Sequence, residues 1–125
     1  PMPLVAAYTA SKTAIEGFTA SLAFELEGFN VRVKLVEPGY APTTRFTANG
    51  SERMQGLIPE AYVPYAQSVF AALGQPQAVT TELDVAEAVW LAANDMSTTL
   101  RYAAGADAVA LAAHRPTAAD NERCL

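Results

Sequence analysis

A long helical pattern followed at once by a short strand pattern constrains the fold of this chain more than any other feature. Between Ala6 and Glu27, apolar residues recur at spacings of three and four, which predicts one helix with a core-facing stripe. The stripe consists of Ile15, Phe18, Leu22, Leu26 and Phe29. Gly28 suits the C-cap of this helix, and the residues from Val31 to Val36 predict a strand. We therefore expect an α/β fold.

The predicted helix also carries a second face of small residues, namely Ala10, Ala14, Gly17 and Ser21. Small side chains let another helix approach closely, so this face can bury against a neighbouring helix or a second subunit. We expect a homo-oligomer that forms through the helix from Ala6 to Glu27. The alternative is a small-residue face that stays exposed.

The predicted strand is not apolar throughout, because Arg32 and Lys34 fall on one side of it. A central parallel strand should be apolar on both faces. Either the long side chains extend past a covering helix to reach water, or the strand begins near the rim of the sheet. We expect the first arrangement.

The remainder of the chain predicts further elements of the same kind. A loop is expected from Tyr40 to about Pro59, then a helix from Glu60 to Leu73 that ends near Gly74 and Pro76. The segment Thr81-Glu82-Leu83-Asp84 should precede a second helix that runs to about Asn94, with Val85, Val89, Ala92 and Ala93 inward. The segment from Arg101 to Leu111 predicts a short strand broken by Gly105, and a loose tail follows His114.

Two side chains near the start of the first helix could carry chemistry. Tyr8 and Lys12 are four residues apart, so they are neighbours on the helix surface. A nearby ammonium favours the phenolate and lowers a phenol pKa that is ordinarily about 10. Such a phenol can exchange a proton with a substrate oxygen, as the interconversion of an alcohol and a carbonyl requires.

A ligand site is expected where the predicted strand ends. Ligands of open α/β sheets bind at the carboxyl ends of the strands. Pro38 suits a strand end because it cannot donate to the sheet ladder, and Gly39 would let a flat ring approach the backbone. The hydroxyls of Thr43 and Thr44 could bind a ligand or cap the loop.

These two motifs, with the helix and strand between them, resemble the C-terminal half of a classical short-chain dehydrogenase/reductase. The residues that carry the resemblance are Tyr8-Thr9-Ala10-Ser11-Lys12, Val36-Glu37-Pro38-Gly39-Tyr40-Ala41-Pro42-Thr43 and the segment from Arg101 to Ala108. The resemblance implies the last two strands, with covering helices, of a doubly wound parallel Rossmann-type sheet. Residues 1–125 would then be the C-terminal part of a single NAD(P)-binding domain.

The resemblance also implies roles for individual residues in an NAD- or NADP-dependent oxidoreductase. Tyr8 would be the acid/base, while Lys12 would lower its pKa and bind the cofactor ribose. Pro38, Gly39, Ala41 and Thr43 would contact the cofactor, with the backbone of Ala41 near its carboxamide. The substrate would be a small-molecule alcohol or carbonyl, and no metal is expected.

The family's Gly-rich dinucleotide motif and catalytic Ser should lie upstream of Tyr8, and no Gly-x-Gly-x-x-Gly occurs in this sequence. We therefore expect a fragment of a longer protein, inactive by itself. Two alternatives stay open at this point. One is a non-catalytic remnant with a binding or structural role, and the other is an epimerase or dehydratase of the same fold.

Composition and charge exclude other classes of function. A net charge of −5, with eight Lys and Arg spread along the chain, makes nucleic acid and membrane surfaces poor partners. The single cysteine, Cys124, fits a reducing cytoplasm, and we expect that thiol and His114 to be inert. Glu37 and Trp90 are expected to be structural. Several residues could line either a substrate cleft or the core: Tyr40, Phe46, Met54, Leu57 and Tyr62.

Overall fold

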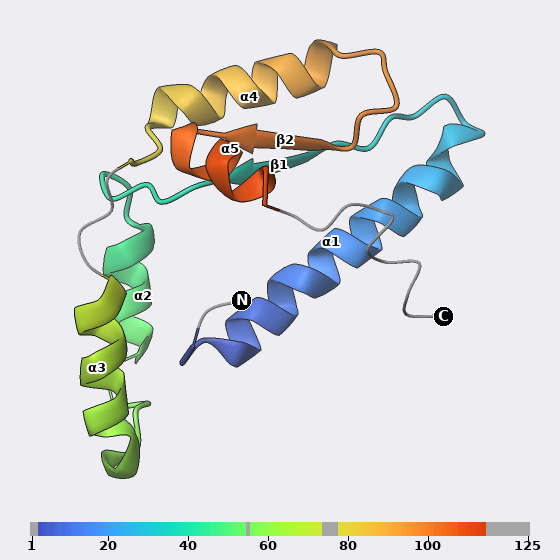
Figure 1. Cartoon of the computed structure of the whole chain (residues 1–125). Coiled ribbons are helices and arrows are strands. Elements are labelled where there is room, and N and C mark those ends of the chain that lie inside the picture. The colour runs from blue at the N-terminus through green and yellow to red at the C-terminus, as the bar shows by residue number, and fades with distance from the viewer. Residues whose placement is uncertain (1–2, 55, 74–77, 115–125) are drawn as a thin grey trace.

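The computed structural model describes residues 3–54, 56–73 and 78–114 of the chain (Figure 1). The fold is α/β, as predicted, and its two strands form one parallel sheet. The strands are β1 (Leu35–Pro38) and β2 (Arg101–Ala104). The helices are α1 (Ala6–Glu27), α2 (Phe46–Met54), η1 (Glu60–Tyr62), α3 (Val63–Leu73), α4 (Glu82–Asn94) and α5 (Ala106–Ala112).

The two strands pair in register, so that Leu35 lies opposite Arg101 and Pro38 lies opposite Ala104. Helix α4 packs along both strands, and α5 packs against β2 (Figure 1). Because both strands end at the same level, the segments that follow them meet at one edge of the sheet. That edge holds the predicted ligand site.

The core of the described chain is small and made mainly of alanine. Its buried apolar residues are Ala66, Ala88, Ala92, Tyr102, Ala104 and Ala108. Ala88 and Ala92 are one helical turn apart on α4, and side chains this short let the helix lie close to the sheet. The side chain with the least exposure is Thr80, at 1%.

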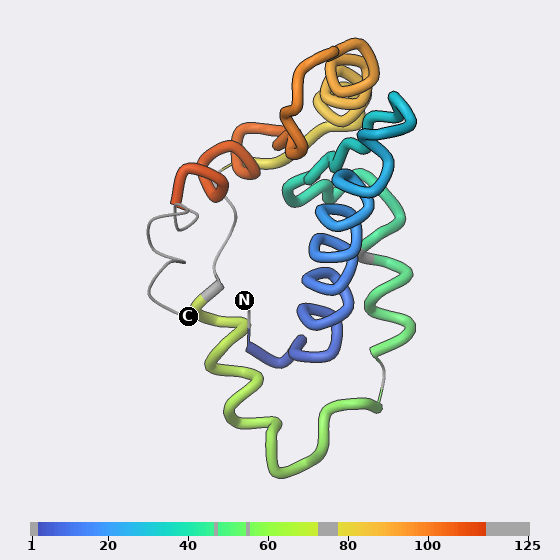
Figure 2. The backbone as a smooth tube through the Cα atoms, turned by 90° about the vertical axis from the view of Figure 1, so that its right-hand side faces the viewer, coloured from blue at the N-terminus to red at the C-terminus, as the bar shows by residue number. Residues whose placement is uncertain are grey.

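Helix α1 has the predicted bounds, but the predicted core stripe is wrong. None of its residues is buried, and Phe18 and Phe29 are 67% and 77% exposed. The reason is visible in Figures 1 and 2, where α1 lies apart from the layer formed by α4 and the sheet. The small-residue face of α1 is exposed as well. Within the described residues, the helix therefore meets little that could bury either face.

The segment between α1 and β1 differs from its prediction. Gly28 does occupy the C-cap, but the left-handed residue of the turn is Asn30, with a φ of 56°. The strand begins only at Leu35, so Arg32 and Lys34 precede it. Lys34 Nζ donates to the carbonyls of Ser97 and Thr99, each at 2.8 Å. These side chains thus lie at the rim of the sheet, and the expected extension past a covering helix is wrong.

The helix expected from Glu60 to Leu73 is present, with its first three residues in a 3-10 turn. The predicted loop from Tyr40 to Pro59 is wrong, because it contains α2. Weak helix formers such as Gly50 hid this helix, while Thr44 Oγ1 accepts from the N–H of Phe46 at 3.3 Å and caps it. The proposed stop signals Gly74 and Pro76 lie outside the described residues.

Helix α4 is present, but it begins at Glu82, three residues before the predicted start, and Thr81 caps it. The Thr81 hydroxyl accepts from the Asp84 N–H, and the Asp84 carboxylate accepts from the Thr81 N–H, which completes a capping box. The inward set was only partly right, because Ala92 is buried and Val85 half-buried but Val89 and Ala93 are exposed. Trp90, expected to have a structural role through packing, is exposed in the described structure.

The strand predicted after Arg101 ends at Ala104, and Gly105 has a φ of 96° that only glycine adopts freely. The chain then forms α5 instead of a second strand piece. His114 is exposed, and its Nδ1 lies 2.7 Å from the carbonyl of Ala110. Cys124 and the rest of the predicted tail lie outside the described residues.

Candidate functional site

The first turns of α1 bring together the predicted acid/base pair. The Nζ of Lys12 lies 5.4 Å from the centroid of the Tyr8 ring, within the range of a cation–π contact. Ser11, between them, donates its hydroxyl proton to the carbonyl of Tyr8 at 2.7 Å. The Tyr8 side chain is 48% exposed, so its phenol is accessible to a ligand.

The second predicted group follows β1, and one ring contact connects it to the first. Pro38 is the last residue of the strand, and Gly39, Ala41 and Thr43 lie on the loop after it. That loop leads into α2, whose first residue, Phe46, packs edge-on against Tyr8 with 6.3 Å between ring centroids. The structure thus places the predicted acid/base pair beside the start of α2, which directly follows the post-β1 loop, defined here as residues 39–44.

Thr43 and Thr44 do different things in this loop. Thr43 Oγ1 donates to the Glu82 carboxylate at 2.8 Å, which attaches the loop to the start of α4. Thr44 Oγ1 donates to the carbonyl of Ala41 at 2.8 Å. The capping role considered for both threonines is therefore confirmed for Thr44. For Thr43, the hydroxyl keeps its lone pairs as acceptors while its proton is held by Glu82.

The start of the post-β1 loop is held by residues that sequence reasoning missed. The N–H of Tyr40 donates to Asp107 Oδ2 at 2.6 Å, and the carbonyl of Tyr40 accepts from the N–H of Thr80 at 2.8 Å. The N–H of Gly39 donates to the carbonyl of Ala104 at 3.1 Å. Three segments distant in the sequence therefore fix the first two residues of the loop.

The sequence predicted that Gly39 lies against a flat ligand ring, but its neighbour in the structure is Asp107. A Cβ at this position would overlap the carboxylate of Asp107. Glycine is therefore required here so that Asp107 can reach the backbone, and no open space for a flat ring lies on that side. Gly105 plays a similar part, because a Cβ there would overlap the hydroxyl of Thr80.

Hydrogen bonds keep the carboxylates of this region ionised. Burial raises the pKa of Asp107, but hydrogen bonds from Thr80, from the Tyr40 N–H and from the start of α5 outweigh it, so the net shift is downward. The pKa of Glu82 is lowered by its own backbone N–H and by the Thr43 hydroxyl. Both groups act as acceptors at neutral pH.

A signal for the missed residues does exist in the sequence. Gly105 follows β2 directly, as Gly39 follows β1, and Asp107 comes two residues after Gly105. The carboxyl ends of neighbouring parallel strands meet at one edge of a sheet. A strand-ending glycine with an aspartate two residues later was therefore a candidate for this site.

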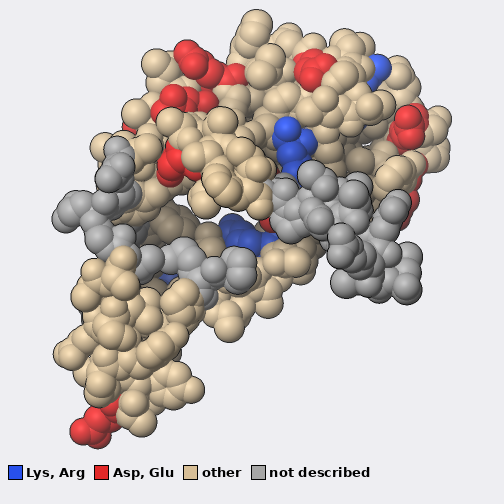
Figure 3. Space-filling model, in the orientation of Figure 1, with Lys and Arg blue, Asp and Glu red and all other residues tan. Residues whose placement is uncertain are grey.

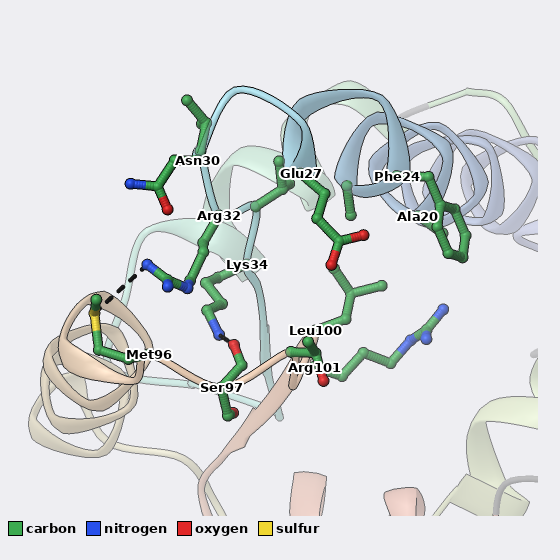
Figure 4. A pocket seen from close by; sticks show the side chains of 14 residues that line it. Ala20, Phe24, Glu27, Asn30, Arg32, Lys34, Met96, Ser97, Leu100 and Arg101 are labelled. Carbon is green, nitrogen blue, oxygen red and sulfur yellow. Dashed lines mark hydrogen bonds between the residues drawn. The ribbon is translucent and has the colours of Figure 1, made fainter.

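A cavity of about 690 Å³ lies elsewhere in the described structure. It opens between the second half of α1 and the loop from α4 to β2, and Figure 4 shows Phe24, Arg32, Lys34 and Met96 around it. Its strand-side residues precede β1 and β2 or, in the case of Arg101, begin β2, whereas the post-β1 loop follows the other end of β1. This cavity therefore lies at the opposite end of the sheet from the post-β1 loop.

The same described residues contain no group of three or more His, Cys, Asp or Glu placed to hold a metal ion. None of their helices is both long and apolar enough to cross a membrane. On the face in Figure 3, the few Lys and Arg side chains lie apart from one another and form no basic patch.

The tyrosine–lysine pair on α1 and the Pro-Gly segment at the end of β1 carried the resemblance, and comparison with known proteins gives the class. Residues 1–55 match the family model described as short chain dehydrogenase. The chain is of the short-chain dehydrogenase type. No solved structure matches it significantly.

Curated relatives agree with the family match. An uncharacterized oxidoreductase of Schizosaccharomyces pombe is 32% identical over 104 residues, which is 82% of this chain and 42% of that protein. Retinol dehydrogenase 8 of Homo sapiens is 39% identical over 84 residues, or 58% of this chain and 27% of that protein. Carbonyl reductase family member 4 of Danio rerio is 44% identical over 52 residues, or 42% and 22%. The chain thus spans about two fifths of the length of the first relative.

Proposed function

We propose that the protein is an oxidoreductase that interconverts an alcohol and a carbonyl with NAD or NADP. The observation that carries this proposal is the Tyr8–Lys12 pair, with Nζ 5.4 Å from the ring centroid and the Tyr8 ring against Phe46, just after the post-β1 loop. The names of the relatives, an oxidoreductase, a retinol dehydrogenase and a carbonyl reductase, support the same class of reaction.

In this proposal Tyr8 gives a proton to the substrate oxygen during reduction and takes it back during oxidation. The ammonium of Lys12 stabilises the phenolate that remains, and it also donates to the ribose of the cofactor. Half-exposure of the Tyr8 side chain leaves the phenol accessible. When bound, the nicotinamide cofactor supplies the hydride chemistry.

The post-β1 loop would hold the nicotinamide end of that cofactor. Pro38 ends β1 and Gly39 begins the loop, and the backbone of Ala41 offers groups to the carboxamide. Thr43 fits a carboxamide NH₂ group, because its own proton is donated to Glu82 and its lone pairs can accept. The donors and acceptors of the loop are therefore compatible with the carboxamide of a nicotinamide cofactor.

We infer further that residues 1–125 are the C-terminal part of a doubly wound Rossmann-type domain. The chain exposes 9869 Å², whereas a compact monomer of 13.2 kDa is expected to expose about 6,400 Å². Its exposed large apolar side chains include Phe18 and Phe24 of α1. Further strands and helices packed against the sheet and α1 would bury such surface.

A homo-oligomer formed through α1 and a location in the cytoplasm belong to the same proposal. The small-residue face of α1 at Ala10, Ala14 and Gly17 is exposed and could accept the same helix of a second copy. Sedimentation of the complete gene product that contains this chain would test the first point. A monomer at micromolar concentration would contradict it.

The function itself is tested by nucleotide binding and turnover. The complete gene product should quench or enhance the fluorescence of NADH or NADPH on binding, and it should oxidise one of them in the presence of a ketone or aldehyde from a broad panel. Binding of a nucleotide without turnover would indicate that the substrate is not in the panel. A protein that binds neither nucleotide would contradict the proposal and favour a non-catalytic role.

A further inference from the structure

We propose that Asp107 is a positioning residue, whose carboxylate sets the direction in which the post-β1 loop presents its backbone to the nicotinamide end of the cofactor. The inference rests on the function proposed above and adds a residue outside both sequence motifs. Asp107 lies in the first turn of α5, after β2.

Two hydrogen bonds join Asp107 to the other segments of the site. Its Oδ2 accepts from the N–H of Tyr40, and its Oδ1 accepts from the Thr80 hydroxyl, both at 2.6 Å. The Thr80 hydroxyl also lies 3.0 Å from the carbonyl of Ala104, the last residue of β2. One carboxylate therefore connects the post-β1 loop, the end of β2 and the segment that leads into α4.

The contact between the Asp107 carboxylate and the Thr80 hydroxyl is tightly packed. Thr80 is 1% exposed, and Asp107 is half-buried beside it. Glycine at positions 39 and 105 leaves the room that the carboxylate and the Thr80 hydroxyl occupy. A carboxylate is the side chain suited to this place, because both partners, a backbone N–H and a hydroxyl, can donate to it.

Both backbone groups of Tyr40 are thereby held. Asp107 holds its N–H, and the N–H of Thr80 holds its carbonyl. In a trans peptide the carbonyl and the next N–H point in opposite directions. Since the carbonyl of Tyr40 points toward Thr80, the N–H of Ala41 must point away from Thr80. Ala41 is the residue whose backbone we assign to the carboxamide of the cofactor.

Loss of Asp107 should disturb this loop and leave the sheet in place. The bond from the Gly39 N–H to Ala104, the β1–β2 ladder and the Thr81 cap of α4 do not involve the carboxylate. The adenosine half of a dinucleotide would not meet this loop in the proposed site. A variant at position 107 should therefore weaken recognition of the nicotinamide ring selectively.

The test compares two ligands on the complete gene product. Affinities for NADH (or NADPH, if preferred) and for ADP-ribose, which lacks the nicotinamide ring, are measured for wild type and for Asp107→Ala. We expect the variant to bind the dinucleotide about tenfold more weakly or worse, as loss of a charged hydrogen bond implies, and ADP-ribose unchanged. Asp107→Asn keeps one carbonyl oxygen for the Tyr40 N–H and should recover most of the affinity. Glu87→Ala, on the exposed part of α4, is the matched control and should leave both affinities unchanged.

Equal weakening for both ligands in Asp107→Ala, or no weakening for either, would overturn the positioning role. Amide hydrogen exchange of Tyr40 in the nucleotide-free protein separates this failure from a failure of the proposed function. Faster exchange in Asp107→Ala than in Glu87→Ala supports the contact even if wild type binds no dinucleotide, in which case only the oxidoreductase proposal falls. Unchanged exchange at Tyr40 counts against Asp107 directly.

Discussion

At the scale of single residues, the central contact is the one between Lys12 and the ring of Tyr8. The ammonium lies over the ring face at 5.4 Å from its centroid, so one cation contacts the aromatic system that carries the phenol oxygen. The edge-on contact of Tyr8 with Phe46 holds the same ring from another side. Substitutions that keep the ring but change one polar group can therefore separate chemistry from packing.

Tyr8→Phe removes the phenol oxygen and keeps the ring contacts. We expect it to abolish measurable turnover in the complete gene product, a loss of about 100-fold or more, while NADH or NADPH still binds. Steady-state rates and fluorescence titration measure the two effects. Tyr65→Phe, on an exposed tyrosine of α3, is the control. Near-normal turnover in Tyr8→Phe would remove Tyr8 from the acid/base role.

Lys12→Met removes the cation from the side of the phenol. We expect weaker dinucleotide binding, because a ribose donor is lost, and slower turnover, because the phenolate loses its counter-charge. Lys12→Arg keeps the charge and should retain more of the wild-type affinity and turnover. Wild-type affinity and turnover in Lys12→Met would speak against this role.

At the scale of elements, the loop between α4 and β2 is fixed by a polar cluster at the rim of the sheet. The Tyr102 hydroxyl donates to Asp95 Oδ2 at 2.6 Å, and Ser97 donates to Asp95 from both its N–H and its hydroxyl. Lys34 Nζ binds the carbonyls of the same loop. The cluster thus orients Lys34 and the start of β2 together.

This cluster has a pH dependence that can be measured at one carboxyl group. The Tyr102 hydroxyl, followed by the Ser97 groups and Lys34, lowers the pKa of Asp95 from 3.8 to about 2. Because the folded pKa is the lower one, the stabilisation is complete above about pH 4 and is lost as the pH falls toward 2. In Tyr102→Phe we expect the Asp95 carboxyl to titrate at higher pH in carbon-detected NMR. The pKa of Asp84, lowered by Thr81, should not move, and an unchanged Asp95 midpoint would contradict the assignment.

Some of these helices and strand ends could be predicted from the sequence, and others could not. Helices α1 and α4 were predictable because their caps and spacing are local, and the strand end at Pro38 follows from the missing N–H of proline. Helix α2 was missed because Asn49 and Gly50 have low helix propensity. Asp107 was missed because the local signal, an aspartate two residues after a strand-ending glycine, does not identify its partner Tyr40, which is 67 positions away.

At the scale of the whole molecule, the described chain is open. Its core consists of a few alanines with Tyr102, while α1 has no buried residue. The sheet has only two strands, and isolated two-stranded sheets are marginally stable in water. One contact between helix α1 and the sheet is the ion pair between Arg101 and Glu16, at 3.7 Å. An exposed pair of this kind contributes little to stability.

Residues 1–125 expressed alone should therefore be neither active nor well folded. We expect a weak near-UV circular dichroism signal, a broad thermal transition and no tight binding of NADH or NADPH, because the core is small and no Gly-rich phosphate-binding turn is present in the sequence. The complete gene product, measured in parallel, is the control. A cooperative melt with micromolar nucleotide affinity would show instead that this chain completes a site by itself.

The bond between Tyr40 and Asp107 also has a consequence for the order in which the protein is made. The ribosome finishes Tyr8, Lys12 and the whole post-β1 loop well before it reaches Asp107. A premature stop codon after α4 would give a product that contains every candidate catalytic and cofactor-binding residue but not the carboxylate that orients the loop. In truncated or rearranged copies of such a gene, intact Tyr8 and Lys12 codons alone would therefore say little about whether the product can work.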